Sequence, residues 1–265
     1  MVKSAAITAL ACYFFTNPAT AQNGLQFGDP GCDLEFKDRE PADRKFFQLC
    51  HSSDLKIPLW VGYVLTKKDL NGPAERPSGF KTDDKLKSLG AKESDYVRSG
   101  FSRGHMAPAE DFSRSKEAIR STFILSNVVP QFQGVNGGRW AQLEATVRDL
   151  VAAAGTAYVF TGPVFEEEDV DTIGDGEVGI PTHTFKVVLT IGPGEAKKMY
   201  AVIMPNAERV SGDVNSFTTT VREVEDKTGF DFFSGLSQAE QNRLETVQEK
   251  LPEKAKKKKP RRRRA

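Results

Sequence analysis

The run Ser-Arg-Gly-His at residues 102–105 places a guanidinium two positions before an imidazole. An imidazole with a pKa near 6.5 can take a proton from water at neutral pH. A guanidinium can hold a phosphate through two parallel hydrogen bonds. A base beside an anion clamp suits the cleavage of a phosphodiester, so His105 and Arg103 are the first candidate catalytic residues.

Oxygen-bearing side chains follow this run at Asn127, Asn136 and Glu144, and a further arginine stands at Arg148. Amide and carboxylate oxygens are the kind of ligand that Mg²⁺ prefers. Together with the base and the anion clamp, these residues indicate a metal-dependent nuclease.

The spacing of Asn136, Trp140, Glu144 and Arg148 is four residues at each step. On an α-helix each step rotates the side chain by only about 40°, so the series shares one broad face. An amide, a carboxylate and a guanidinium can therefore look into one cavity. Asparagine is also favoured as a helix N-cap, which is the alternative explanation for Asn136.

The elements that position these residues are predicted from apolar periodicity and from turn residues. Strands are expected at 59–65, 123–129 (ended by Pro130), 157–160, 184–191 and 198–204. Helices are expected at 115–122, 136–154 (capped by Gly155), 216–227 and 238–248. Strands in runs with few helices between them indicate an α+β fold of one domain.

Two stretches of the chain are expected to be irregular. Residues 67–89 are rich in Pro, Gly, Asp and Lys and predict a long loop, which carries Arg76. Residues 101–112 contain Gly104 and Pro108, which exclude a regular helix.

The first 21 residues have the order of a secretory signal peptide. Lys3 precedes an apolar run at 5–15, and Ala-Thr-Ala at 19–21 offers a cleavage site. The apolar run is shorter than the roughly 20 residues that span a bilayer, which argues against a membrane anchor. A mitochondrial leader is the other alternative, but the segment lacks Arg-rich amphipathic character. Export, to a secreted or periplasmic location, is therefore favoured.

Export determines how the three cysteines are interpreted. Cys12 leaves with the signal peptide, so Cys32 and Cys50 remain in an oxidising compartment. One disulfide between them is expected, linking the N-terminal segment to the core. Two cysteines and three scattered histidines lack the spacing of a zinc site.

The C-terminal segment 249–265 carries ten basic and two acidic residues, a net charge of +8. The whole chain is +1 and Lys3 is the one charge of the leader, so residues 22–248 carry −8. We expect the basic segment to be a disordered tail. It could bind a polyanion by counterion release or contact an acidic membrane surface. The alternative is a solvated tail without a specific role.

The ordered set of motifs resembles the DNA/RNA non-specific endonuclease family, whose active-site signature is Asp-Arg-Gly-His. This family includes Serratia-type nucleases and mitochondrial endonuclease G and belongs to the ββα-metal, or His-Me finger, group. The resemblance covers most of residues 50–236. Besides 102–105 and the residues at 127, 136, 144 and 148, it includes the stretches 161–165, 180–186 and 228–233. It implies a ββα-metal fold with a central, mainly antiparallel sheet flanked by helices.

The resemblance also implies a role for each candidate residue. His105 is expected to be the general base, and Asn136 the direct protein ligand of Mg²⁺. Asn127 and Glu144 are expected to hold the waters on that ion. Arg103 and Arg148 are expected to brace the phosphate, with Arg76 as a third arginine.

One position departs from the signature, because Ser102 stands where the family has aspartate. Serine brings no negative charge near the metal, so we expect an altered metal preference, towards Mn²⁺, rather than loss of activity. His51 and His183 lack comparable neighbours, and Trp60 and Trp140 lie at apolar spacing. We expect core or surface roles for the two histidines and core positions, rather than base-stacking roles, for the two tryptophans.

The sequence thus predicts an exported, Mg²⁺-dependent, sugar-non-specific endonuclease. It is expected to cleave single- and double-stranded DNA and RNA to 5′-phosphate ends. Two alternatives follow from Ser102 and the tail. One is a nucleic-acid-binding protein with weakened catalysis, and the other a toxin-like interaction module.

Overall fold

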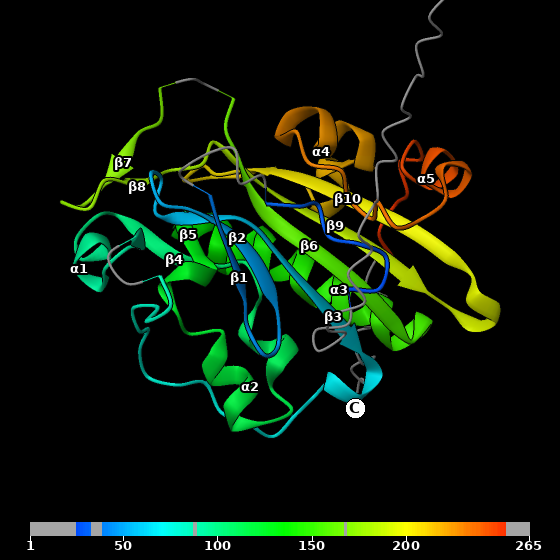
Figure 1. The fold of residues 1–265 in the computed structure, drawn as a ribbon, viewed down its shortest axis with the longest axis horizontal. Coiled ribbons are helices and arrows are strands. Elements are labelled where there is room, and N and C mark those ends of the chain that lie inside the picture. Colours follow the sequence, from blue (N-terminus) through cyan, green and yellow to red (C-terminus); the bar gives the residue numbers. More distant parts are fainter. Residues whose placement is uncertain (1–24, 33–38, 87–88, 167–168, 253–265) are drawn as a thin grey trace, which may run out of the picture.

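The computed structural model describes residues 25–32, 39–86, 89–166 and 169–252, and a seven-stranded antiparallel sheet runs through it (Figure 1). The strand order is β1-β2-β3-β6-β9-β10-β11. The strands are β1 (Arg39–Asp43), β2 (Gln48–Ser52), β3 (Ile57–Thr66), β6 (Thr156–Val164), β9 (His183–Ile191), β10 (Lys197–Pro205) and β11 (Thr218–Thr219). The long central strands pair over their full length, as in the Thr161–Lys186 register of β6 and β9.

Both faces of the sheet are buried, and alternate residues of each central strand serve different cores. In β6, Ala157 and Val159 pack into one apolar cluster, whereas Tyr158 and Phe160 pack into another. This follows from the two-residue period of a strand. A sheet covered on both sides needs apolar residues at successive positions, which explains the continuous apolar runs that made these strands predictable.

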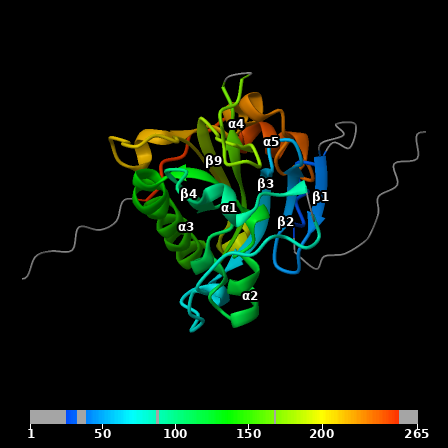
Figure 2. The ribbon, with the colours of Figure 1, turned by 90° about the vertical axis from the view of Figure 1, so that its left-hand side faces the viewer.

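The first face is covered by helix α3 (Ala141–Ala154) and by the hairpin-like pair β4 (Phe101–His105) and β5 (Val128–Phe132) (Figure 2). Leu143, Val147 and Val151 of α3 are buried in the first cluster. Gly155 ends α3 with φ of +124°, a conformation that residues with a side chain rarely adopt. This face carries the residues with catalytic chemistry.

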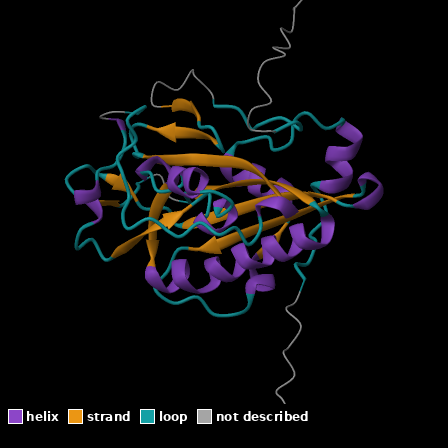
Figure 3. Ribbon diagram, turned by 90° about the horizontal axis from the view of Figure 1, so that it is seen from below, coloured by secondary structure: helices purple, strands orange, loops and turns teal. Residues whose placement is uncertain are grey.

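The second face is covered by α4 (Val221–Thr228) and α5 (Gln238–Leu244), so that helices flank the strands on both sides (Figure 3). Val221, Val224 and Leu244 of these helices pack with Phe232 and Phe233 against the sheet. Thr220 and Ser237 cap the two helices through their side chains.

The remaining elements are short and lie around these layers. They are α1 (Glu93–Tyr96), α2 (Lys116–Ser121), the pair β7 (Thr172–Ile173) and β8 (Val178–Gly179), and several turns of 3₁₀ helix. Ser115 caps α2 by accepting a hydrogen bond from the Ala118 amide.

The architecture confirms the α+β class and the mainly antiparallel sheet. The expected strands at 59–65, 157–160, 184–191 and 198–204 lie within β3, β6, β9 and β10. The helices expected at 115–122 and 136–154 are also present, and Gly155 is the C-cap.

Several boundaries differ from the prediction. Residues 101–105 form strand β4 rather than irregular chain, because Gly104 allows close pairing with β5. Pro130 lies inside β5 rather than ending it, since β5 is an edge strand that tolerates a missing amide donor. Residues 125–127, expected within a strand, form a 3₁₀ turn. The helix expected from residue 216 begins only with α4, after a 3₁₀ turn and a short strand at 214–219. Helix α5 ends at Leu244 rather than at residue 248. The strands β1 and β2 were not predicted.

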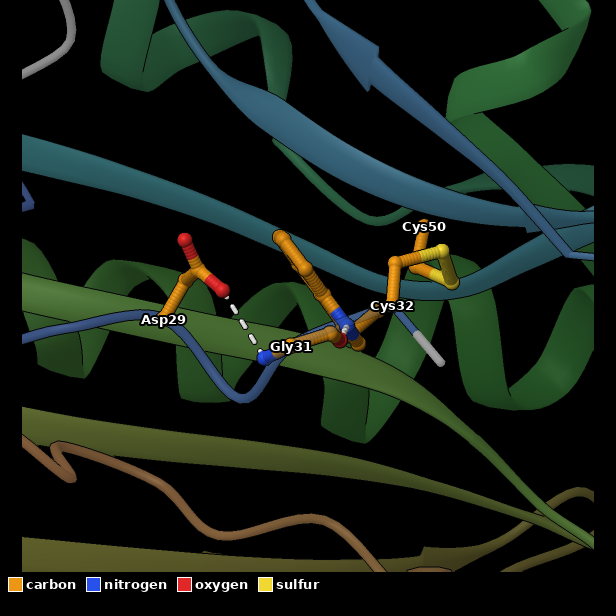
Figure 4. Close-up of a disulfide and its surroundings, with 5 residues drawn as sticks. Asp29, Gly31, Cys32 and Cys50 are labelled. Atoms are coloured by element: carbon orange, nitrogen blue, oxygen red, sulfur yellow. Dashed lines mark hydrogen bonds between the residues drawn. A yellow bond between two sulfur atoms is a disulfide. The ribbon is translucent and has the colours of Figure 1, made fainter. Parts of the chain in front are cut away.

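The expected disulfide is present between Cys32 and Cys50, with 5.4 Å between the Cα atoms (Figure 4). Next to it, the Gly31 amide donates to Asp29 Oδ1, and Trp60 Nε1 donates to the Gly31 carbonyl. The N-terminal segment is therefore bound to β2 and β3 covalently and by hydrogen bonds. Closing a loop of this length stabilises a fold by about 3 kcal/mol.

The segment expected as a signal peptide, residues 1–21, lies outside the described residues, as do residues 253–265 of the basic tail. The folded body extends beyond its expected end at residue 248. Leu251 is 3% exposed, and its backbone exchanges two hydrogen bonds with the Asn215 side chain. Among the described helices, none has the length and apolar character needed to cross a bilayer.

His51 gives the fold a measurable dependence on pH. Burial in β2 lowers the pKa of His51 from 6.5 to about 4. Between these values the unfolded chain binds a proton and the folded chain does not, so stability falls as the pH drops through the window. The shift corresponds to about 3 kcal/mol.

Urea denaturation at pH 7.5 and pH 4.5 should therefore show a smaller loss of stability for His51→Leu than for the wild type. His183→Gln, at a less buried histidine, serves as the control and should follow the wild type more closely. Equal losses for His51→Leu and the wild type would contradict the role of His51.

Candidate active site

Six of the residues singled out in the sequence line one cavity of about 410 Å³ on the α3 face of the sheet. They are Arg76, Arg103, His105, Asn136, Glu144 and Arg148. Phe80, Pro108, Ala109, Glu110, Gly137 and Ala141 complete the wall. Residues separated by up to 72 positions thus meet in one place, and their side chains include a base, three cations and two oxygen ligands.

Strand β4 places Arg103 and His105 on one face, because alternate residues of a strand point the same way. Gly104 between them is required for packing. A Cβ atom there would lie 2.1 Å from Gln131 Oε1 on the paired strand β5. Any larger residue would push β4 away from β5 and move the imidazole.

His105 is 8% exposed, and its environment favours the neutral imidazole. Burial, aided by the charge of Arg76, lowers the pKa of His105 to about 3. The ring hydrogen bonds with the Thr122 backbone, whereas Nε2 is buried and has no hydrogen-bond partner among the described residues. The lone pair of an unpartnered nitrogen at a cavity wall is available to accept a proton.

Two phenylalanine rings pack against this imidazole and against each other. The ring centroids of Phe80 and Phe123 both lie 4.9 Å from that of His105 and 5.0 Å from one another. Arg103 stacks over Phe80 at 5.1 Å, and Arg76 over Phe123 at 5.5 Å. The three rings form one cluster that shields the imidazole from water, and each phenylalanine carries one of the two guanidinium groups.

Each of the three arginines is paired with a carboxylate. The N–O distances are 2.6 Å for Arg76–Glu110, 3.2 Å for Arg103–Glu93 and 2.9 Å for Arg148–Asp111. The first two pairs are exposed, and the third is partly buried, with Asp111 held also by the Tyr63 hydroxyl at 2.9 Å. An exposed pair exchanges partners at little cost, whereas a buried pair keeps its geometry.

Asn136 lies in a π-helical turn, Val135–Trp140, that leads directly into α3. The sequence left open that Asn136 caps the helix. The N-cap positions are instead Gly134 for the π-helical turn and Trp140 for α3, and neither makes a side-chain cap hydrogen bond. The π-turn directs Asn136 to the cavity together with Glu144 and Arg148.

Asn127 does not line the cavity, which differs from its expected place among the metal's waters. It is fully buried, and its side chain makes three hydrogen bonds of 2.9 Å with backbone groups. Oδ1 accepts from the Ala107 amide, and Nδ2 donates to the carbonyls of Ala107 and Thr122. It therefore holds Ala107, two residues after His105, and Thr122, whose backbone contacts the imidazole.

Ser102 likewise stays outside the cavity wall, and its hydroxyl donates to Oε1 of Gln133. Strand alternation places it with Gly104 on the face of β4 opposite to His105. The histidines without predicted roles are also elsewhere: His51 is buried in β2, and His183 lies 3.6 Å from Glu166. Trp60 and Trp140 are buried, as expected.

Known proteins resemble this chain both in sequence and in fold. The profile of a family described as DNA/RNA non-specific endonuclease matches residues 24–239. Nuclease C1 of Cunninghamella echinulata var. echinulata is 36% identical over 227 residues, which are 80% of this chain and 88% of that protein. Human mitochondrial endonuclease G is 35% identical over 193 residues, 69% of this chain and 63% of that protein.

A solved structure of EndoG bound to its inhibitor EndoGI superposes with a TM-score of 0.76 at 29% identity, covering 86% of this chain and 95% of that chain. The chain belongs to the DNA/RNA non-specific endonuclease family. Its ββα-metal fold is therefore confirmed as well. The mitochondrial relative is longer than the matched region, since the chain spans less than two thirds of it.

Members of this endonuclease family depend in general on a divalent metal ion. The cavity fits such an ion, because the Asn136 amide and the Glu144 carboxylate offer oxygen ligands at its wall. The described lining holds no cysteine and one histidine, His105, so it lacks the set of sulfur and nitrogen ligands that is typical of a structural zinc site.

The endonuclease site has one further charge that the sequence analysis did not identify. Lys186 of β9 is 1% exposed, and its Nζ lies 4.9 Å from the Trp140 ring centroid without a hydrogen-bond partner among the described residues. Burial lowers the pKa of Lys186 and raises that of Glu144, and each charge opposes the other's shift. Lys186 is thus a buried counter-charge for Glu144.

The substitution Phe80→Ala tests whether the aromatic rings determine the pKa of the His105 imidazole. Replacing Phe80 with alanine admits water to His105, so we expect its pKa to rise by about one unit or more. NMR titration of the imidazole in metal-free protein would measure the change. Phe46→Ala, at a half-buried ring that stacks with Lys45 and Arg114 instead, is the matched control and should leave the pKa unchanged. An unchanged His105 pKa in Phe80→Ala would show that other groups dominate.

Proposed function

We propose that this protein is an exported, metal-dependent, sugar-non-specific endonuclease that hydrolyses DNA and RNA to 5′-phosphate ends. The observation that carries the proposal is the unpartnered Nε2 of His105 at the wall of a cavity that also presents three arginines and two oxygen ligands.

His105 acts as the general base. With the Thr122 backbone bond on one side of the ring, Nε2 is free to take the proton from a water molecule that attacks the phosphorus. The low pKa keeps the imidazole neutral at physiological pH, so the base is in its active form before the substrate arrives. Asn127 holds the backbone of Ala107 and of Thr122, which contacts the imidazole, and is a positioning residue.

The arginines bind and orient the scissile phosphate. Arg76 and Arg103 line the same cavity as His105 and form exposed ion pairs, and a phosphate can replace Glu110 and Glu93 as their partner. Arg148 stays paired with Asp111, which also accepts a hydrogen bond from the Tyr63 hydroxyl, and presents its remaining donors to the cavity. Bidentate contacts of this kind fix an oxyanion while charge develops on it.

Asn136 and Glu144 would hold the divalent ion, with Mg²⁺ as the proposed species. Such an ion stabilises negative charge on the phosphate and on the departing 3′ oxygen. Ser102 adds no carboxylate to this set, and we propose that Mn²⁺ is accepted as well. The neutral Ser102–Gln133 pair supports this part of the proposal.

Low selectivity follows from the nature of the contacts. The cavity offers arginines and a metal site, which recognise phosphates, and phosphates carry no direct sequence information. The Cys32–Cys50 disulfide supports export, because such bonds persist in oxidising compartments. Secretion or a periplasmic location is therefore proposed in preference to a mitochondrial one.

Conversion of supercoiled plasmid by the full protein tests this function. With Mg²⁺ or Mn²⁺ we expect nicking that EDTA abolishes, and His105→Ala should lower the rate by about 10²- to 10⁴-fold. His183→Ala, outside the cavity, is the matched control and should cleave at the wild-type rate. Undiminished cleavage by His105→Ala would exclude the assigned base. A folded wild type that binds DNA but never cleaves it would favour a weakened, DNA-binding protein.

The basic tail is proposed to attract the polyanionic substrate. Because Leu251 packs into the core, the informative truncation removes residues 253–265, which carry nine basic residues and one acidic residue. We expect weaker DNA binding at low salt and a shallower dependence of affinity on salt concentration. Fluorescence anisotropy with labelled DNA from 50 to 300 mM salt would measure both. An unchanged salt slope would exclude a role in substrate binding.

A further inference from the structure

Three carboxylates meet on the face of the sheet opposite to the catalytic cavity, where α4 and α5 lie side by side (Figure 1). Glu225 belongs to α4, Asp231 to the turn that follows it, and Glu245 directly follows α5. Each side chain offers an oxygen atom that lies within 4.8 Å of the other two. The family motifs identified in the sequence leave Glu225 and Glu245 without a role.

The protein itself only partly neutralises this cluster. Arg222 is the one cation paired with it among the described residues, through contacts of 2.6 Å to Glu245 Oε2 and 3.3 Å to Glu225 Oε2. Glu225 Oε1 accepts a hydrogen bond from the Phe232 amide. One guanidinium therefore faces three carboxylates, which leaves a charge of −2 when all three are ionised.

Glu245 provides an independent indication of a ligand. Its side chain is completely buried, yet Oε1 has no hydrogen-bond partner among the described residues. An ionised oxygen in such a position is costly unless something satisfies it. Burial raises the pKa of Glu225 to about 7 and also raises that of Glu245, as expected for carboxylates that lack a second cation.

We propose that Glu225, Asp231 and Glu245 bind a calcium ion that clips α4 to the end of α5. Ca²⁺ takes oxygen ligands at 2.3–2.6 Å, so oxygens on opposite sides of the ion stand up to about 5 Å apart. The smaller Mg²⁺ draws its ligands closer and retains several waters. Asp231 is exposed and gives the ion a path of entry, whereas the buried glutamates are held in place in advance.

The site is structural and separate from catalysis. Its ligands come from the α4–α5 layer, which packs through the second apolar cluster, while the catalytic residues surround α3 on the other face. A divalent ion that binds only the folded chain raises its stability in proportion to RT ln(1 + [Ca²⁺]/Kd). We therefore expect calcium to affect unfolding rather than the chemical step.

Thermal unfolding of the full protein with CaCl₂ or with EGTA tests the proposal. Asn136→Ala serves as the background, so that an ion in the catalytic cavity does not contribute. With Ca²⁺ at ten times its Kd, we expect Tm to rise by about 3 to 6 °C. Isothermal titration should show one calcium ion per chain, bound more tightly than Mg²⁺.

Asp231→Asn, at an exposed position, should remove the calcium response in the Asn136→Ala background while the protein remains folded. Introduced alone into the wild-type chain, it should leave nuclease activity unchanged. Glu223→Gln, at an exposed carboxylate of the same helix outside the cluster, is the matched control and should keep the response. Equal calcium responses in Asp231→Asn and in the control would overturn the assignment. So would a calcium-independent Tm that rises as the pH falls from 8 to 6, because the cluster would then hold a proton.

Discussion

The pairing of β4 with β5 places the imidazole of His105, and it requires Gly104, because a Cβ atom there would collide with the buried Gln131 side chain. Pairing with Val128 places the backbone of His105, and Asn127 then holds Ala107, two residues further along the chain. The long helix packs against the same pair through Trp140, whose Nε1 donates to the His105 carbonyl at 3.4 Å. The base, the helix and the sheet are consequently one rigid unit.

Desolvation affects the His105 imidazole and the Glu144–Lys186 pair in different ways. The phenylalanine rings keep the imidazole neutral and its lone pair unoccupied, which costs stability but prepares the base. Glu144 lines the cavity and Lys186 is buried beneath it, and each charge opposes the pKa shift that desolvation causes in the other. Burial of opposite charges in this way keeps the cavity close to electrical balance, although residues 22–248 as a whole are acidic.

Much of the site could be predicted from the sequence, because its central residues lie on regular elements. Asn136, Trp140, Glu144 and Arg148 are spaced by four residues at each step, which indicates one face of a helix. Arg103 and His105 could be identified from their residue types and motif, although the strand that carries them was not predicted. Phe80 comes from a long loop, and its position next to His105 depends on a path that no periodicity encodes. The strands β1 and β2 escaped prediction because they are short, lie towards the edge of the sheet and contain Pro41 or polar residues.

The resting ion pairs have a consequence for which ligands can enter the cavity. Glu93 and Glu110 occupy two arginines in the absence of a ligand and act as tethered competitors at high effective concentration. A single small anion displaces one carboxylate from its arginine, so its net gain in binding free energy is small. A chain of phosphates displaces both at once and adds the second contact within the same molecule. The two carboxylates therefore favour ligands that carry several linked phosphates over ligands that carry one. A nucleic-acid chain belongs to the first class, and a free mononucleotide to the second.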